Sequence, residues 1–255
     1  PRRSVNTTGN ALPIAVNASR NGEKPLRLLY IVRTDDVQNT AHAMEKQIVG
    51  VANSKGGTGK STIAIHLACC ALETGVNVSL VDTDAQGSVK DWANVRPDSM
   101  ETPNVVCNND PYSIHVTIER LEDELIVVDS PAGLSEMTGE VLGLSDLVLV
   151  PIMPSVLDLW GVGEFERVLE EQAQEGLEVV LVTSKYDHAS TLSEELAEYL
   201  SEEYPDYSHL EYGICDRVAY KRQMGQGQTV LEGNDARAKN EVRRLYHDIN
   251  DLLHE

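Results

Sequence analysis

At residues 54–62 the chain carries the sequence SKGGTGKST, and this stretch decides the fold. An apolar run at residues 48–52 precedes it and predicts a β-strand, while the apolar spacing over residues 60–72 predicts a helix. Glycines in a turn between a strand and a helix let backbone N–H groups converge on an anion, which the helix dipole also favours. We therefore predict a phosphate-binding loop, in which Lys60 contacts the β- and γ-phosphates of a nucleotide and Ser61 ligates Mg²⁺.

The loop differs from the usual pattern G-x-x-x-x-G-K-[ST] at two positions. Ser54 stands at the place of the first glycine, and an extra lysine, Lys55, follows it. This variant, K-G-G-x-G-K-[ST], resembles the deviant Walker A motif of the ParA/MinD superfamily of dimeric ATPases. The alternative interpretation, a glycine- and lysine-rich surface turn, does not account for the flanking strand and helix.

The resemblance implies ATP and Mg²⁺ as cofactors and a homodimer that forms when ATP binds. It also implies that Lys55 and Lys60 are catalytic, and that Lys55 reaches across the dimer interface to the nucleotide of the partner. The loop residues expected to bind the nucleotide are Lys55, Gly56, Gly57, Thr58, Gly59, Lys60, Ser61 and Thr62. Lys185 joins them, because residues 183–186 occupy the place where the adenine-side loop of that family begins.

Strand and helix patterns alternate from residue 47 onward, which predicts an α/β fold with a mostly parallel, doubly wound sheet of the P-loop NTPase class. Strands are predicted at residues 48–53, 78–82, 125–129, 147–151 and 178–183. Helices are predicted at residues 60–73, 113–121, 135–142, 157–175, 191–204 and 235–253. The chain has 255 residues, 41% of them apolar, which suffices for one such domain at residues 47–255 and an N-terminal arm at residues 1–46. We expect the arm to be partly flexible, with a candidate strand at residues 26–32 and a candidate helix at residues 35–46.

Two carboxylates follow the predicted strand at residues 78–82. Asp82 ends that strand and Asp84 comes two residues later, in the sequence DTDAQG. Carboxylates at a strand end that faces Mg·ATP can contact metal-bound water and orient the attacking water. The segment resembles the D-x-D-x-Q motif of ParA-type ATPases, with Ala85 where proline is usual, and this implies that Asp84 positions the water and Asp82 supports the metal shell. Its spacing after the phosphate loop favours this interpretation over a solubilising turn.

A third carboxylate, Asp129, ends the apolar run at residues 125–129, which has the form of a Walker B strand. Asp129 is expected to hold Mg²⁺ directly or through water. The sequence DSPAG at residues 129–133 also occurs in MinD-type proteins, so it does not separate the two branches of the superfamily. By contrast, P-x-x-P-S-x-x-D at residues 151–158 and the region at residues 216–253 resemble the compact partition ATPases.

Charge is unevenly distributed along the chain. The formal net charge is −20, yet seven of the 14 lysines and arginines that follow residue 46 lie between residues 217 and 244. A basic patch on an acidic body predicts contact with DNA phosphates. The residues expected to bind DNA are Arg217, Lys221, Arg222, Arg243 and Arg244. Glu232, Asp235 and Glu241 are interleaved with them, so an ordinary helix of mixed charge is the alternative.

These features favour a DNA-partition ATPase. The resemblance implies that ATP closes a sandwich dimer, that the dimer binds DNA without sequence preference, and that a centromere-bound, ParB-like partner stimulates hydrolysis. Such a protein is cytoplasmic and associated with the nucleoid. No apolar run of about 18 residues occurs, so no segment is expected to span a membrane, and the partition branch implies no membrane partner. The basic start of the chain lacks the apolar segment of a secretory signal.

Three other hypotheses remain at this stage. A MinD-like membrane-positioning ATPase needs a basic, amphipathic anchoring helix, whereas residues 245–255 end acidic and Gln86 favours the partition branch. An ATPase of the nitrogenase iron-protein type needs paired cysteines for a cluster, and the spacing of the four cysteines provides none. A scaffold that binds ATP without hydrolysing it also fits these residues, and single-turnover hydrolysis distinguishes it.

Overall fold

The computed structural model describes residues 46–173, 176–187 and 192–254. The predicted N-terminal arm, apart from Lys46, lies outside the described residues. In the described part of the chain, seven strands form one sheet in the order β3-β2-β4-β1-β5-β6-β7, and every pair is parallel. The strands are β1 Gln47–Asn53, β2 Val78–Asp82, β3 Asn104–Cys107, β4 Leu125–Ala132, β5 Leu147–Ile152, β6 Glu178–Tyr186 and β7 Ser208–Cys215.

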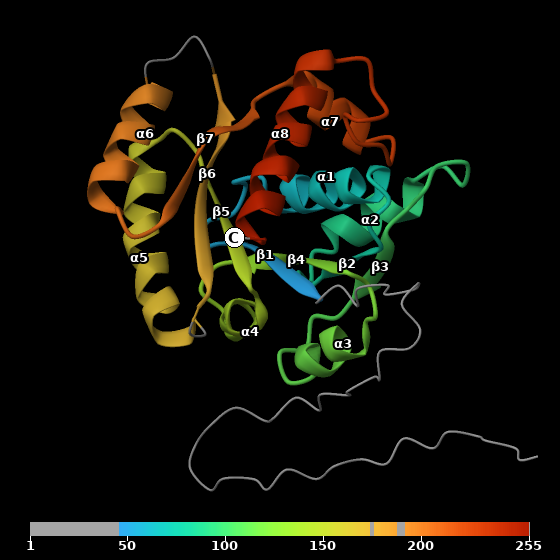
Figure 1. Cartoon of the computed structure of the whole chain (residues 1–255), viewed down its shortest axis with the longest axis horizontal. Coiled ribbons are helices and arrows are strands. Elements are labelled where there is room, and N and C mark those ends of the chain that lie inside the picture. Colours follow the sequence, from blue (N-terminus) through green and yellow to red (C-terminus); the bar gives the residue numbers. More distant parts are fainter. Residues whose placement is uncertain (1–45, 174–175, 188–191, 255) are drawn as a thin grey trace, which may run out of the picture. The chain divides into compact units, whose positions relative to one another are not determined.

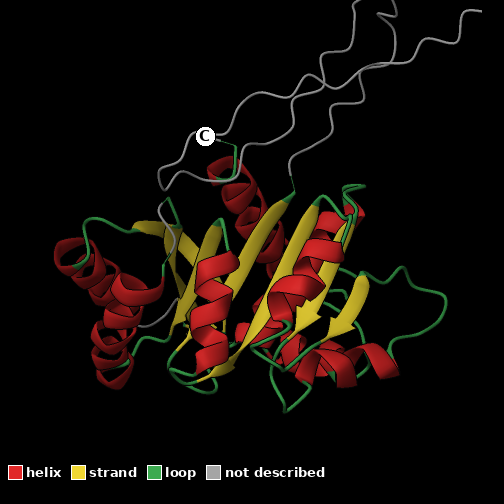
Figure 2. Cartoon of the chain, turned by 90° about the horizontal axis from the view of Figure 1, so that it is seen from below, coloured by secondary structure: helices red, strands yellow, loops and turns green. Residues whose placement is uncertain are grey.

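Helices cover both faces of this sheet, as Figures 1 and 2 show, so the predicted doubly wound architecture is confirmed. One face packs against α1 Lys60–Glu73, α2 Ser88–Val95, α7 Val218–Met224 and α8 Ala236–Leu252. The other face packs against α3 Ile114–Arg120, α4 Glu136–Leu144, α5 Val156–Gln172 and α6 Leu192–Glu203. Both faces are therefore apolar, which explains why the strands are continuous hydrophobic runs.

The alternation of side chains along β1 shows how the two layers are built. Val49 and Val51 point into the cluster under α1 and α8, whereas Ala52 belongs to the cluster on the opposite face. Gly50 also lies against the α4 side, where a Cβ atom would come within 2.6 Å of the Ser145 hydroxyl oxygen. Glycine at this position therefore allows α4 to approach the sheet closely.

The structure adds four elements to those predicted from the sequence: β3, β7, α2 and α7. β3 is a four-residue edge strand without a buried residue, and β7 mixes polar and apolar residues, so neither has the pattern of a central strand. The two helices are only eight and seven residues long, shorter than most helices that periodicity detects. The strands that were predicted agree with β1, β2, β4, β5 and β6, although β4 and β6 run three residues further.

The order of the strands places the motifs side by side. β4 lies between β1 and β2, with Asp82 opposite Asp129 and Asn53 opposite Ala132. The carboxyl ends of these three strands therefore carry the phosphate loop and the predicted carboxylates at one edge of the sheet. Ligands of open parallel sheets bind at such an edge.

Candidate active site

The phosphate loop leaves β1 and enters α1 through glycines that need an unusual backbone conformation. Gly57 and Gly59 have φ angles of 77° and 96°, in the left-handed region. Gly59 is the N-cap of α1, and no side chain caps this helix end. The backbone N–H groups of the first turn are thus left for another acceptor, as in an anion-binding helix terminus.

Two residues at the end of β6 hold this loop in place. The Ser184 hydroxyl donates to the carbonyl oxygen of Thr58 at 2.7 Å, and the Lys185 ammonium donates to the carbonyl oxygen of Gly57. Lys185 has a φ angle of 55°, so its own backbone is in the left-handed region. The structure therefore places Lys185, predicted to bind nucleotide from the adenine side, against the phosphate loop itself. Its contact with nucleotide stays a prediction.

Lys60 lies at the start of α1 and is almost fully buried. Its ammonium donates to the carbonyl oxygen of Lys55 at 2.9 Å. Burial lowers the pKa of Lys60, and the carboxylates of Asp129 and Asp84 oppose this shift. The loop is also tied to β1, because the backbone N–H of Lys55 donates to the side chain of Asn53 at 3.0 Å.

Asp129 is the most unusual carboxylate of the site. Its side chain is completely buried, and neither carboxylate oxygen accepts a hydrogen bond of good geometry from the described residues, although the Ser61 hydroxyl lies close enough to lower its pKa. Burial raises the pKa of Asp129 to about 7; Asp82 and Asp84 raise it further, whereas Ser61 and Lys60 favour the charged form. A buried carboxyl group without partners is costly, and a cation at this position would offset that cost.

Asp82 is arranged differently. One of its carboxylate oxygens accepts the backbone N–H of Asp84 at 3.2 Å and the other accepts the N–H of Lys90 at 3.0 Å. Lys90 belongs to the first turn of α2, so Asp82 satisfies a helix end that lacks a capping side chain of its own. Burial raises the pKa of Asp82, and these backbone donors oppose the shift. A role in the metal shell stays a prediction.

Asp84 lies in the turn between β2 and α2, which is anchored to β4. Its carboxylate accepts the N–H of Gln86 at 2.8 Å and is half-buried. Between the two acids, Thr83 donates its N–H at 3.1 Å and its hydroxyl at 2.7 Å to the carbonyl oxygen of Asp129. Thr83 was not among the residues predicted from the sequence, because a single threonine between two acids carries no signal of its own.

Two features of this edge fit a bound Mg·nucleotide. The unpartnered carboxylate of Asp129 offers the oxygen ligands that Mg²⁺ prefers. The buried hydroxyl of Thr58, in the phosphate loop, has no hydrogen-bond partner among the described residues. Both groups would be satisfied by a metal ion and an anion at the loop.

A cavity of about 360 Å³ adjoins the start of α1. It is lined by residues of α1, of the ends of β6 and β7, and of α7, among them Gly59, Thr62, Lys185, Arg217 and Tyr220. We call it the side cavity. The sequence predicted a DNA contact for Arg217 and no role for Tyr220. Their place in the cavity wall could not be predicted, because only the fold brings α7 next to the phosphate loop.

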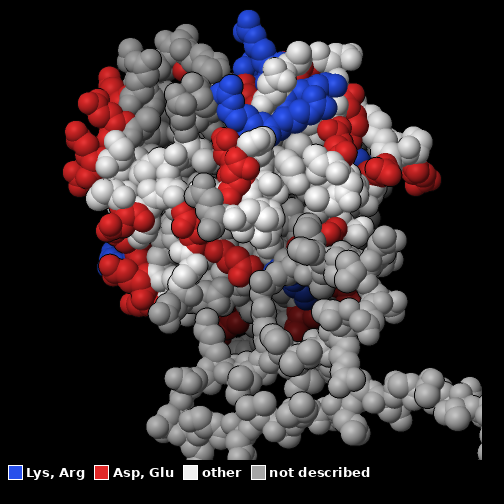
Figure 3. All heavy atoms as spheres, in the orientation of Figure 1, with Lys and Arg blue, Asp and Glu red and all other residues white. Residues whose placement is uncertain are grey.

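The residues predicted to bind DNA gather on α7 and α8. Figure 3 shows lysine and arginine side chains over these helices in the upper part of the view, with acidic side chains over α5 and α6. Several of the cations are paired: Lys221 with Asp216 at 2.9 Å and Arg243 with Glu73 at 3.3 Å. Arg222 is exposed and has no ion-pair partner among the described residues.

Arg217 is set apart from this group. Only 18% of its side chain is exposed, and it forms an ion pair with Glu241 of α8. It therefore lies in the wall of the side cavity, with its Nε atom 2.7 Å from the Glu241 carboxylate, rather than on the open basic surface. Contact between Arg217 and DNA stays a prediction.

A parallel sheet whose adjacent strand ends carry a glycine-rich loop, a buried lysine and three carboxylates defines a P-loop nucleotide-binding protein. The chain belongs to the CobQ/CobB/MinD/ParA nucleotide binding domain family, whose model matches residues 49–230. It is an ATPase of the ParA/MinD type.

Known proteins are similar to this chain over different lengths. The maintenance of carboxysome distribution protein A of Halothiobacillus neapolitanus is 25% identical over 209 residues, which cover 79% of this chain and 95% of that protein. The chromosome-partitioning ATPase Soj of Thermus thermophilus is 30% identical over 152 residues, which cover 48% of this chain and 61% of Soj. The structure of cobyrinic acid a,c-diamide synthase from Mycobacterium smegmatis, with bound ATP analog and magnesium, has a TM-score of 0.62 at 18% identity and covers 81% of this chain and 94% of that one.

These similarities agree with the family and the fold predicted from the sequence. As for a membrane, none of the helices in the described ranges combines the length and the apolar character that crossing one requires.

Proposed function

We propose that this chain is a Mg²⁺-dependent ATPase that dimerises on ATP, binds DNA without sequence preference, and hydrolyses ATP when a partner protein stimulates it, so that a cargo is moved or segregated. The buried, unpartnered carboxylate of Asp129 beside Lys60 is the observation that carries the proposal. The similarity to a chromosome-partitioning ATPase and to a carboxysome distribution protein supports the cargo-moving role.

Each step of hydrolysis has a candidate group in the site. The amides of the first turn of α1 and the Lys60 ammonium bind the phosphates, and Lys60 exchanges its present acceptor, the Lys55 carbonyl, for a phosphate oxygen. Asp129 and Ser61 would hold Mg²⁺, which neutralises charge on the β- and γ-phosphates. Asp84 lies in the turn that Thr83 attaches to β4, and it orients the attacking water. The side cavity takes the nucleoside part of ATP.

Lys55 is the group proposed to act on the nucleotide of the partner subunit. Its backbone is bonded within the loop, through the N–H to Asn53 and through the carbonyl oxygen to Lys60. Its ammonium forms no hydrogen bond or ion pair with the described residues. A cation next to a phosphate site but unpaired within its own subunit is available to a second nucleotide across a dimer interface.

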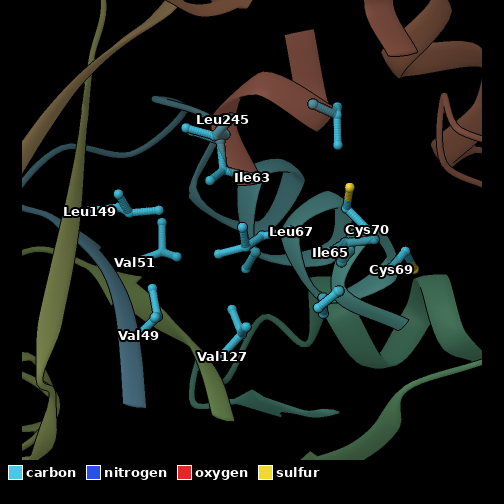
Figure 4. Close-up of a cluster of buried hydrophobic side chains, with 14 of the residues drawn as sticks. Val49, Val51, Ile63, Ile65, Leu67, Cys69, Cys70, Val127, Leu149 and Leu245 are labelled. Carbon is cyan, nitrogen blue, oxygen red and sulfur yellow. The ribbon is translucent and has the colours of Figure 1, made fainter. Parts of the chain in front are cut away.

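The membrane-positioning alternative would use an amphipathic helix such as α8. Four apolar residues of α8 are buried, Ala238, Val242, Leu245 and Ile249, and Tyr246 and Leu252 are partly buried against the same core. Figure 4 shows Leu245 of α8 beside Ile63 of α1, within the core. The apolar face of α8 thus contributes to the fold and is not exposed to a bilayer, which favours DNA over a membrane as the surface that this ATPase binds.

Duplex binding across a salt titration tests the proposed function. We expect the Asp84→Ala protein with Mg·ATP to bind DNA of any sequence, with a log–log salt slope that falls by about 0.9 for each phosphate contact removed. Neutralising Arg222, Arg243 and Arg244 together should weaken binding and flatten this slope. Neutralising Arg120 of α3, on the other face of the sheet, is the matched control and should change neither.

An unchanged slope in the triple variant would move the DNA contact elsewhere. Binding of the ATP-bound protein to anionic liposomes instead of DNA would support the membrane-positioning function.

A further inference from the structure

Glu241, in the second turn of α8, is a point where three elements meet. Its side chain is only 10% exposed, although glutamate normally lies in solvent. Its carboxylate accepts hydrogen bonds from Arg217 Nε at 2.7 Å and from the Tyr220 hydroxyl at 3.0 Å, and a longer one from the Cys215 N–H at 3.4 Å. The donors come from the end of β7, the following loop and α7.

All three donor residues line the side cavity next to the phosphate loop. A single carboxylate of α8 therefore holds one wall of the space assigned above to the nucleoside part of ATP. A ligand that fills this cavity touches side chains whose position Glu241 determines.

Tyr220 extends the connection to the phosphate-binding helix. Its ring meets the ring of His66, on α1, edge to face, with 5.1 Å between the ring centroids. His66 is itself fixed, because Nδ1 lies 2.7 Å from the carbonyl oxygen of Thr62 and Nε2 accepts the N–H of Val230 at 3.1 Å. Tyr220 is thus packed between α1, which begins at the phosphate loop, and Glu241 of α8.

The same helix carries basic residues on its solvent side. Lys239, Arg243 and Arg244 lie within three residues of Glu241, and Arg237 is one turn before it. Arg243 reaches back to Glu73, at the end of α1. Glu241 therefore stands between the wall of the side cavity and the basic face of α8.

We propose that Glu241 is a positioning residue that couples occupancy of the side cavity to the order of α8 and its basic face. This inference rests on the proposed function, because the ligand of the cavity is the nucleoside part of ATP. A bound nucleotide restricts the motion of the Arg217 and Tyr220 side chains. Because both side chains are hydrogen-bonded to Glu241, the motion of α8 is restricted as well. By linkage, any ligand that orders the basic face of α8 strengthens nucleotide binding by the same factor.

Amide hydrogen exchange measures this coupling without requiring DNA. Peptides that cover residues 236–252 are followed in the wild-type protein with and without saturating Mg²⁺ and a non-hydrolysable ATP analogue. We expect the analogue to slow exchange in α8 by at least about fivefold, the lower end of typical coupling between sites. In Glu241→Gln, which keeps the shape of the side chain but removes its charge, the slowing should fall below about twofold at the same saturation.

Glu73→Gln is the matched control, since it removes an acid that faces α8 without touching the side cavity. It should retain the full slowing of exchange. Arg217→Lys, which keeps the charge but loses the two-pronged contact with Glu241, should behave like Glu241→Gln. This second variant decides the question if Glu241→Gln does not fold.

The outcomes separate this inference from the proposed function. If the wild-type protein does not bind the analogue, the proposed function is wrong and the coupling falls with it. If the analogue binds but leaves α8 exchange unchanged, or slows it equally in wild type, Glu241→Gln and Arg217→Lys, then Glu241 only stabilises the fold and the inference is overturned.

Discussion

Replacing Asp129 by asparagine should stabilise the nucleotide-free protein, although it removes a group of the proposed metal site. The carboxyl group has a pKa of about 7 in the folded state and 3.8 as its reference value, a difference of about 3 units. At about 1.4 kcal/mol per unit, the ionised carboxylate lowers the free energy of unfolding by about 4 kcal/mol at pH 7 and above. The neutral carboxyl group and the asparagine amide are both buried without partners, so their burial costs of about 1–3 kcal/mol largely cancel. A net gain of about 4 kcal/mol at pH 7 remains.

The pH dependence of this gain is a sharper test than its size. A carboxyl group whose pKa is raised by folding contributes stability below its unfolded pKa and loses it as the pH rises through the folded pKa. The amide cost does not change with pH. The gain of Asp129→Asn over wild type should therefore grow by about 2.5 kcal/mol between about pH 5 and pH 7.5.

Urea unfolding in the presence of a chelator measures both quantities. Asp91→Asn, at an exposed carboxylate of α2, controls for the loss of one negative charge and should show no such growth. In a parallel series without the chelator, added Mg·ADP should stabilise the wild type by about 2.7 kcal/mol at a ligand concentration of 100 Kd, and should stabilise Asp129→Asn much less. A gain that is equal at both pH values would refute the reasoning, since it would mean that the carboxylate is charged in the folded protein without penalty.

Three further predictions concern the loop, the water and the core. Lys60→Ala should abolish nucleotide binding, whereas Lys55→Ala should bind nucleotide as a monomer and fail to dimerise; titration calorimetry and light scattering check this, and equal loss of binding in both would remove the role of Lys55 across the interface. Asp84→Ala should bind Mg·ATP and accumulate as a dimer while turnover falls by roughly two to four decades, and normal turnover would assign the water to another residue. Burial lowers the pKa of His66 from 6.5 to about 4, so the unfolded chain takes up a proton first and stability should fall by about 1.4 kcal/mol per pH unit from pH 6.5 toward pH 4. Asp129 and Asp82, whose pKa values burial raises, act in the opposite direction, so the slope should be taken as the difference between the Asp129→Asn protein and the same protein with His66→Gln. No difference in slope would show that folding does not lower the pKa of His66.

The sequence was informative where chemistry is local. Two motifs can be recognised from a few consecutive residues. One is a glycine-rich turn between a strand and a helix, and the other is an apolar strand that ends in an acid. This is why the phosphate loop and the fold around it were predicted with nearly the right boundaries. Asp129 was singled out in the same way, as the last residue of an apolar run, and its role as a metal ligand stays a prediction.

The sequence was less informative where a role depends on contacts between distant residues. Arg217 looked like a DNA contact because its neighbours are basic, yet it is paired with Glu241, 24 residues later. Asp82 looked like a second metal group, but it also accepts an N–H from α2, a helix too short to be predicted. The sequence shows how many charged residues are present and where they lie along the chain. It does not show which of them form ion pairs or hydrogen bonds with each other in the folded protein.

On the proposed function, the turn at residues 83–87 controls the rate of hydrolysis separately from nucleotide binding. Thr83 donates both its N–H and its hydroxyl to the carbonyl oxygen of Asp129, so the segment that carries Asp84 is attached to β4. The phosphate loop then determines whether ATP is bound, and the turn at residues 83–87 determines how fast the bound ATP is hydrolysed. Residues 83–87 are then the place where the interval between capture and release of a cargo can be lengthened or shortened while the affinity for nucleotide stays the same.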